Sequence, residues 1–455
     1  MNKIFIEIDR QKNIEMPPNL EGWVKNDSLA RFVVDIIDKI DTSNIEDLYK
    51  AGGSNAYPPK MLLSLLLYCY AKGIFSSRKI EAATYELMPV IYIANGLHPD
   101  HTSISNFRKN FLKEIEKLFT QFLKIAAEMG VLKMGDISID GTKIQANASK
   151  HKALSYGHAM KLEEKIKEEI KLLLKKAEEP DNGDMNDIKI PEEISRREDR
   201  LTKIGEVQEK IKERYKIKYN LKKAEYDEKV KKKKEKEKEL DRKLGGRKPT
   251  EPLKTPPNNE QVNLTDEESR IMPKSGGGYI QAYNAQASTD MDTMLIVGTH
   301  VSQNTNDKKE LQPALKEIDK LPSEIAKKVD RIAVDNGYKS EENANLLDKN
   351  HIKGYMPIGR EKEHNKIEDL LTKEPNSPDN PTPIEEVNYR MSTKEGKEFY
   401  AKRKSTIEPI FGIIKNVMGF VRFSLRGLDA VTGEWNIVSL AYNFKRLHSI
   451  SMSTI

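Results

Sequence analysis

The chain has 455 residues, which predicts roughly three domains, and its net charge of +6 permits a nucleic-acid partner without requiring one. Its single cysteine, Cys69, excludes an intrachain disulfide and a multi-cysteine zinc site. The longest apolar run, at residues 61–71, is too short to cross a bilayer, and the start lacks a signal-peptide pattern, so we expect a soluble cytoplasmic protein with no membrane partner.

Residues 1–130 are predicted to form an all-α domain. Apolar residues recur at helical spacing after Ser28, and Pro59 and Gly73 mark the two ends of a strongly apolar helix. A third helix is expected to start near Ser76. A long fourth helix is expected to run from Thr102 or Ser103 to Gly130.

The segment 76–110 could form a helix-turn-helix that binds DNA. The second helix would then present residues of types that contact bases and phosphates, namely Ser105, Asn106, Arg108 and Lys109. An ordinary helical bundle is the alternative.

The pattern changes twice after residue 130. From Asp136 to Ala146 polar and apolar residues alternate, which predicts a strand. Residues 158–178 then place apolar side chains at coiled-coil spacing among Lys and Glu, and a longer helix follows the turn at 179–184. With a predicted loop at 247–276, this charged helical hairpin would be an insertion over residues 158–276. A solvated coiled coil is its simplest interpretation; DNA contacts by the lysines of 229–234, or dimer contacts, are the alternatives.

Globular signals return at residue 277 and continue to residue 455. Strands are expected at 279–288, 294–301, 331–334 and 353–357, and helices at 311–321, 340–347, 405–418 and 433–447. The polar stretch 361–389 is expected to be another excursion. Together with residues 131–157, this order predicts an α/β core, a mixed sheet flanked by helices.

Three acidic residues are candidates for metal-assisted chemistry on phosphodiesters. Such chemistry needs charge neutralisation, which two divalent ions about 4 Å apart can supply, and Mg²⁺ requires several carboxylate oxygens. Asp140 lies within a predicted strand, where Asp is disfavoured. Asp335 ends another strand, and Glu408 opens a helix.

Each acid also has a simpler interpretation. Asp140 could be a half-exposed polar position, and Asp136 on the same strand face is its rival. Asp335 could cap the next helix. Glu408 with Ser405 has the spacing of a capping box.

Four segments of the chain resemble bacterial insertion-sequence transposases with a DDE catalytic core, in the broad IS4/IS5 grouping and closest to the IS1182-type family. They are ISIDGTKIQANASK, GGGYIQAYNAQASTD with LIVGTHVSQNTND, IAVDNGY, and YAKRKSTIEPIFGIIKNVMGFVRFSLRG. The N-terminal YPPKMLLSLLLYCYAKGIFSSRKIE and GLHPDHTSISNFRKNF also resemble the helical domain of that family.

The resemblance implies an RNase H-like core in which Asp140, Asp335 and Glu408 are the catalytic, metal-binding acids. It also implies a Tyr-Arg-Glu-Lys signature, matched here by Tyr400, Arg403, Glu408 and Lys415. One extra residue separates Arg403 from Glu408, so Arg403 or Lys404 could take the arginine's role. These basic and aromatic residues would contact DNA near the cut.

The expected function is therefore DNA transposition, by metal-dependent strand cleavage followed by strand transfer. Its cofactor would be two Mg²⁺ or Mn²⁺ ions for each site. Its partners would be the terminal inverted repeats and target DNA, bound by a homodimer associated with the nucleoid. A non-catalytic DNA-binding protein derived from a transposon, or an RNase H-like nuclease, is the alternative.

Overall fold

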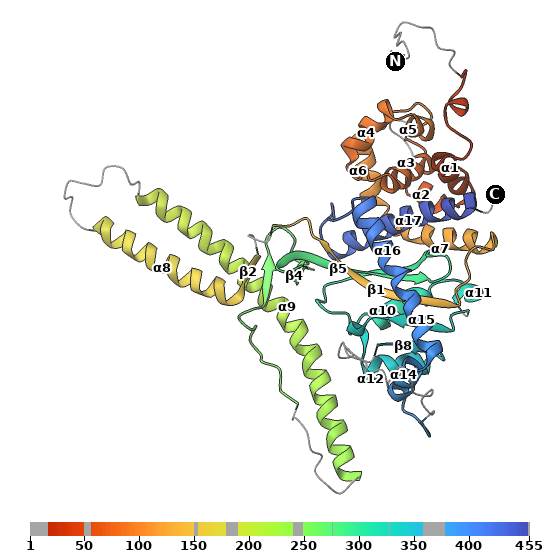
Figure 1. Cartoon of the computed structure of the whole chain (residues 1–455). Coiled ribbons are helices and arrows are strands. Elements are labelled where there is room, and N and C mark those ends of the chain that lie inside the picture. The colour runs from red at the N-terminus through yellow and green to blue at the C-terminus, as the bar shows by residue number, and fades with distance from the viewer. Residues whose placement is uncertain are drawn as a thin grey trace, which may run out of the picture. The chain divides into compact units, whose positions relative to one another are not determined.

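The computed structural model describes residues 17–49, 56–149, 153–178, 190–239, 249–274, 276–326, 328–357 and 378–453 (Figure 1). The chain separates into two compact units. The first comprises Met1–Ile144 and Asn284–Ile455, and the second comprises Gln145–Tyr283. Both combine helices with strands, so the chain is mixed α/β.

The N-terminal part of the first unit is helical, as its apolar spacing predicts. Ser28 accepts a hydrogen bond from the Ala30 N–H and caps the first long helix. Gly73 follows the apolar helix with φ +81°, where a Cβ would lie 2.6 Å from the Met418 carbonyl oxygen. The helices are η1 (Leu20–Trp23), α1 (Leu29–Lys39), α2 (Ser43–Glu46), α3 (Pro59–Ala71), α4 (Ser77–Glu86), α5 (Met88–Ile93), α6 (His101–Asn110) and α7 (Leu112–Glu128).

The expected long helix up to Gly130 is wrong, because the chain forms α6 and α7 with a break at Phe111. Phe111 has φ −112° and ψ 22°, outside the helical range. Its ring stacks on Tyr49, with centroids 5.4 Å apart, and packs on Phe107. Apolar residues continue at helical spacing on both sides of the break, so the pattern alone does not reveal it.

The C-terminal helix α17 (Leu428–Ser453) lies in the core of the first unit. It packs against α3, α7 and the strand β6 (Ile296–Ser302) (Figure 1). The side chain of Asn443 bonds both backbone groups of Ile296, and Phe444 packs on Phe122 with ring centroids 4.7 Å apart. The N-terminal helices and the sheet therefore share one hydrophobic core.

The sheet of the first unit is mixed, as expected, with the order β6-β5-β1-β7-β8. Strand β1 (Asp136–Gln145) pairs in parallel with β7 (Arg331–Val334), and β7 pairs in parallel with β8 (Lys353–Tyr355). Strand β5 (Tyr279–Asp290) pairs antiparallel with β6. This places β1 in the middle of the order. The strands β7 and β8, which run parallel to it, lie on one side.

Helices of the first unit follow these strands. They are α10 (Leu311–Asp319), α11 (Ser323–Ala326), α12 (Glu341–Lys349), α14 (Pro383–Ser392), α15 (Lys394–Lys404) and α16 (Ile407–Gly412), the last continuing into a π-helical turn (Ile413–Val417). Of these, α10, α12 and α16 lie at predicted positions, whereas α11, α14 and α15 were not predicted. A short 3₁₀ turn (Asn336–Tyr338) precedes α12.

The expected polar excursion over 361–389 is wrong in its last part. Residues 358–377 lie outside the described residues, but Pro383–Ser392 form helix α14. Thr382 and Glu385 make a reciprocal capping box, and Pro383 occupies the first turn. These helix-start signals were present in the sequence, and a helix forms despite the polar composition of the segment.

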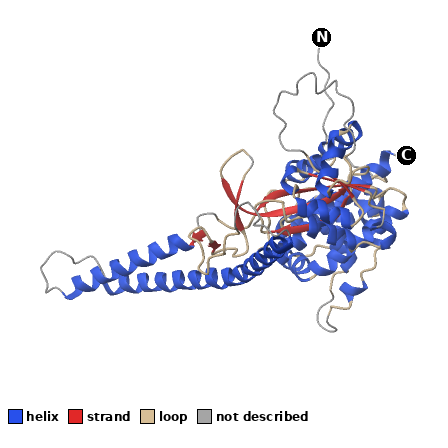
Figure 2. Cartoon of the chain, turned by 90° about the horizontal axis from the view of Figure 1, so that it is seen from below, coloured by secondary structure: helices blue, strands red, loops and turns tan. Residues whose placement is uncertain are grey.

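The second unit is built on two long helices, α8 (Tyr156–Glu178) and α9 (Ile190–Glu239), which lie side by side (Figure 2). They pack through Ala159, Ile166 and Ile204. The predicted turn at 179–184 lies outside the described residues. The predicted loop at 247–276 is wrong in part, because it contains β3 (Gln261–Asn263), which pairs with β2 (Ala153–Ser155), and β4 (Arg270–Pro273), which pairs with residues 279–282 of β5.

Candidate active site

Asp140 and Asp335 lie side by side because their strands are parallel neighbours in register. Ile139 of β1 pairs with Val334 of β7, and each acid is the next residue along its chain. Asp140 is within β1, and Asp335 follows the last residue of β7. The carboxyl end of a parallel strand is where sites of such sheets form.

Glu408 enters from the first turn of α16. The capping-box interpretation is wrong, because the helix is preceded by Thr406 without a side-chain cap, and the Ser405 hydroxyl donates to the Lys402 carbonyl. The capping interpretation of Asp335 is wrong as well, because its side chain makes no cap hydrogen bond. Both carboxylates are instead about half exposed, at 54% each.

All three acids contact one guanidinium, that of Arg403 in the last turn of α15. Arg403 Nη2 lies 2.6 Å from Asp140 Oδ2, and its Nη1 lies 3.9 Å from Asp335 Oδ1 and 3.5 Å from Glu408 Oε1. The Arg403 side chain is only 4% exposed. The structure thus brings together three carboxylates that are up to 268 positions apart in sequence, from Asp140 to Glu408.

Burial dominates the electrostatics of Asp140. It raises the pKa of this carboxyl to about 6, and the nearby acids Asp335 and Asp307 add to the rise. Arg403 and the Gly141 N–H, which donates to Asp140 Oδ1 over 2.8 Å, act in the opposite direction. Perturbed pKa values of this kind cluster at functional sites.

Tyr400 and Lys415 flank the three acids. The half-buried Tyr400 ring packs on the core cluster around Tyr355 and Phe399, and burial raises the pKa of its hydroxyl to about 12. The Lys415 ammonium, from the π-helical turn, donates to Thr142 Oγ1 and to the Lys143 carbonyl. Lys415 is therefore anchored on β1 directly after Asp140, whereas Lys404 is exposed on α15.

Asp307 lies near Asp140 and raises its pKa, and it was not singled out by sequence. Its Oδ1 accepts hydrogen bonds from Asn284 Nδ2 at 2.7 Å and Gln286 Nε2 at 2.8 Å, and lies 3.8 Å from Lys143 Nζ. The signal was the polar run Gln-Asn-Thr-Asn-Asp directly after β6. It resembled an ordinary turn, because only the fold directs Asp307 towards β1 and β5.

Asp136, the rival of Asp140, has another partner. Both of its carboxylate oxygens accept from Arg331, at 2.6 Å each, at the first residue of β7. Asp136 and Arg331 form the first residue pair in the register of β1 and β7, whereas Asp140 comes directly after the last pair, Ile139 and Val334. Asp136 therefore neutralises a structural arginine at the opposite end of the strand pair.

The predicted DNA-contacting residues of α6 differ in exposure. Arg108 is buried, and its Nη1 donates to the Tyr70 hydroxyl at 2.8 Å and to the Phe75 carbonyl at 3.2 Å. Arg108 is therefore a structural residue, and its prediction as a DNA contact is wrong for this conformation. Asn106 and Lys109 are exposed, and Ser105 is half-buried.

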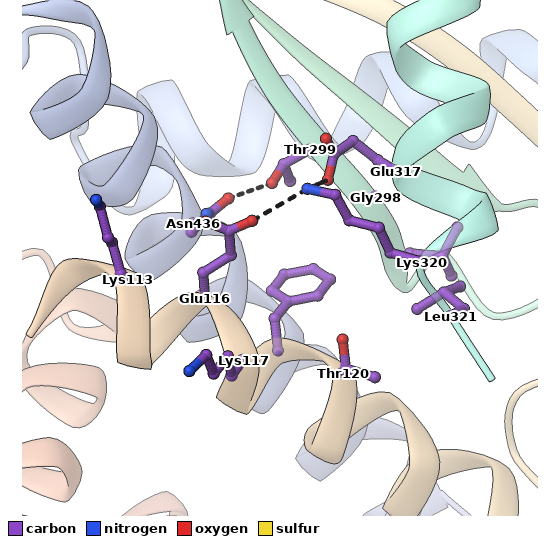
Figure 3. Close-up of a pocket in the computed structure, with 12 residues that line it drawn as sticks. Lys113, Glu116, Lys117, Thr120, Gly298, Thr299, Glu317, Lys320, Leu321 and Asn436 are labelled. Carbon is purple, nitrogen blue, oxygen red and sulfur yellow. Dashed lines mark hydrogen bonds and ion pairs between the residues drawn. The ribbon is translucent and has the colours of Figure 1, made fainter. Parts of the chain in front are cut away.

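A cavity of about 370 Å³ lies between α7, β6, α10 and α17 (Figure 3). None of the three acids lines it. Its polar groups bind one another: Lys320 contacts Glu116 at 3.2 Å and Glu317 at 2.8 Å, and Thr299 bonds Asn436. We assign no chemistry to it.

The donor set around Arg403 fits a divalent cation, because Mg²⁺ and Mn²⁺ prefer carboxylate oxygens. In the described part of the chain, however, no three His, Cys, Asp or Glu side chains are already arranged around a common metal position. The three acids converge on a guanidinium instead. Among the helices of the described ranges, none is long and apolar enough to span a membrane.

Comparison with known families gives two matches. Residues 252–444 match the family described as a Transposase DDE domain, and residues 18–110 match the family described as a Transposase domain (DUF772). The first match includes Asp335, Arg403 and Glu408, and the second includes α1 to α6. No curated protein and no solved structure gives a significant match.

Proposed function

Because the chain belongs to the insertion-sequence DDE transposases of the IS1182-like type, we propose that Asp140, Asp335 and Glu408 are its catalytic, metal-binding acids. The enzyme acts on DNA, and transposases with this domain use divalent metal ions. The family matches favour neither a non-catalytic DNA-binding protein nor a nuclease of another kind. The proposal therefore concerns which residues perform the chemistry.

One observation carries the assignment: a single buried guanidinium lies within 4 Å of all three carboxylates. Carboxylates that are brought close together in space repel one another, so their convergence favours a cation between them. The fold that we propose for the catalytic core is RNase H-like, with Asp140 on the central strand, Asp335 after its parallel neighbour and Glu408 on a late helix. The second unit would be a charged coiled-coil insertion in that core.

The proposed reaction is cleavage at the element ends, which frees a 3′-hydroxyl, followed by attack of that hydroxyl on target DNA. Two Mg²⁺ or Mn²⁺ ions would neutralise the scissile phosphate and activate the attacking oxygen. The acids would hold these ions. Lys415, fixed on β1, and the exposed Lys404 would bind phosphates beside the cut, and Tyr400 would support the neighbouring nucleotide.

Two further features of the proposal concern the assembly on DNA. The N-terminal helices would bind the terminal inverted repeats through the exposed residues of α6, since phosphate and base contacts need accessible side chains. Joining two element ends requires two active sites, so a homodimer on DNA is expected. The protein would then be associated with the nucleoid.

The test is cleavage of a duplex carrying the element end by the full-length chain with Mg²⁺ or Mn²⁺. Asp140→Ala, Asp335→Ala and Glu408→Gln should each lower cleavage by about three orders of magnitude or more. Binding of the duplex should be largely unchanged, because the acids do not attract phosphates.

The matched control is Asp136→Ala, on the same strand but paired with Arg331. It should retain cleavage once differences in folded fraction are corrected. Loss of cleavage in Asp136→Ala with activity kept in Asp140→Ala would show that the catalytic position on β1 is assigned incorrectly.

A further inference from the structure

Arg403 is set apart from the basic residues around it by its burial. Lys402 and Lys404, its neighbours on α15, are exposed, whereas the Arg403 side chain is 4% exposed. A side chain that binds the phosphates of DNA must be accessible to them. In this conformation Arg403 faces the protein's own carboxylates, so contact with DNA does not account for its position.

The contacts of Arg403 use both of its terminal nitrogens. Nη2 pairs with Asp140, Nη1 lies between Asp335 and Glu408, and the buried Nε has no hydrogen-bond partner. Burial disfavours its charge, but attraction to Asp140, the nearby Tyr400, Asp335 and Glu408 outweighs burial and leaves the pKa of Arg403 raised. Arg403 therefore remains a cation inside the acid cluster.

The acids meet on this cation and not on a shared metal position. No set of three potential ligands in the described ranges is already arranged for an ion. The Asp140 oxygen that an ion would need, Oδ2, is occupied by Arg403 Nη2 at 2.6 Å. A divalent ion at this oxygen would lie next to a guanidinium in a partly buried site, where repulsion between like charges is large.

We propose that Arg403 is a positioning residue that holds the three acids together before metal binds, and that metal binding displaces its guanidinium from them. This inference rests on the proposed function, because it takes the three acids to be the metal ligands. Arg403 lowers the repulsion among the acids in the metal-free enzyme. It also competes with the ions, so the enzyme binds metal more weakly than its carboxylates alone would allow.

The first test measures Mn²⁺ binding to the full-length chain without DNA. The amount of free Mn²⁺ is read from its electron paramagnetic resonance signal. Arg403→Gln should bind Mn²⁺ about tenfold more tightly than the wild type, because no guanidinium has to leave. Arg403→Lys keeps the positive charge but lacks the planar guanidinium that contacts several carboxylates at once, so its Mn²⁺ affinity should be intermediate. Lys402→Gln, which removes an exposed charge one residue away, should bind as the wild type does.

The thermal stability of the same proteins distinguishes this role from a merely structural one. Arg403→Gln should melt below the wild type without metal and should recover most of the difference at saturating Mn²⁺. An equal loss of stability with and without Mn²⁺, or unchanged Mn²⁺ affinity in Arg403→Gln, would overturn the inference. Asp335→Asn should lose Mn²⁺ binding; if it does not, the proposed metal ligands are wrong, which is a separate failure.

A second measurement uses the wild type alone, in case the variants do not fold. Phenylglyoxal modifies accessible arginines, and the modified peptide is quantified by mass spectrometry. Labelling of Arg403 should rise several-fold on addition of Mn²⁺, because the displaced guanidinium becomes accessible. Arg108, which is also buried but lies among the N-terminal helices, should not change. Equal labelling of Arg403 with and without Mn²⁺ would contradict its displacement.

Discussion

Gly141 shows at the scale of one residue how closely the acid on β1 is fitted to its surroundings. A Cβ at this position would overlap Gln286 Nε2 and lie 2.9 Å from Asn284 Oδ1. Neither amide can easily yield, because both bond Asp307, and the Tyr338 hydroxyl holds Gln286 from its other side. The absence of a side chain after Asp140 therefore allows β1 to approach β5 at this point.

Gly141→Ala is expected to lower both stability and activity. Overpacking a filled core costs about 1–3 kcal/mol, and the displaced strand would move Asp140 away from Asp335. The measurements are the melting temperature and the rate of cleavage of an end-bearing duplex. Gly135→Ala, just before β1, is the control because a Cβ there meets nothing within 4 Å. If both variants behaved as the wild type does, the close packing at Gly141 would not be important.

Among the elements, α8 and α9 show how a highly charged sequence still forms an ordered pair. Their contact is a narrow apolar seam in which Ile166 is 2% and Ile204 is 4% exposed. Around it, charged side chains pair along and between the helices, as Arg197 does with Glu193 and Glu169. Exposed ion pairs contribute little, so the seam provides most of the stability.

Ile166→Ala and Ile204→Ala are each expected to loosen this helical pair. Truncation of a buried isoleucine costs about 2–5 kcal/mol. Cleavage within α8 and α9 by a protease at low concentration should therefore accelerate by about tenfold or more. Ile217→Ala, at a position on α9 that is 67% exposed, should leave the rate unchanged. Similar rates in all three variants would show that the seam does not hold the helices together.

For the whole molecule, α17 joins the N-terminal helices to the sheet of the first unit. It packs on α3 and α7 on one side and on β6 on the other. An isolated N-terminal fragment would expose the apolar surface that α17 covers, including Phe122. Binding to element ends is therefore best measured on the full-length chain.

On that full-length chain, Asn106→Ala and Lys109→Ala test the proposed DNA contact of α6. Lys109→Ala should weaken binding to element-end and scrambled duplexes alike, because a phosphate contact carries no sequence information. Asn106→Ala should reduce the preference for the element end by about tenfold, if it contacts a base. Lys39→Ala, an exposed lysine at the end of α1, is the control. An unchanged preference in both α6 variants would place end recognition elsewhere.

Local sequence determined most elements of this protein. Periodicity and turn residues predicted β1, β5, β6, β7 and the helices α3, α10, α12 and α17, because each element has its own apolar pattern. The same signals failed where two patterns run together, as at Phe111, or where polar composition hid a capping box, as at Thr382. Candidate acids could be named because Asp140 is an acid within a strand and Asp335 directly follows one.

The tertiary structure alone decided how those residues meet. The parallel register of β1 and β7 separates Asp140 from Asp136 as a candidate, and the approach of α15 buries Arg403 while leaving Lys402 and Lys404 exposed. Asp307 is held beside β5 by hydrogen bonds from Asn284 and Gln286. Arg108 is buried, so it is not accessible for DNA contact. Local patterns report on neighbours within a few residues, whereas burial and charge pairing depend on residues that are distant in sequence and adjacent only after folding.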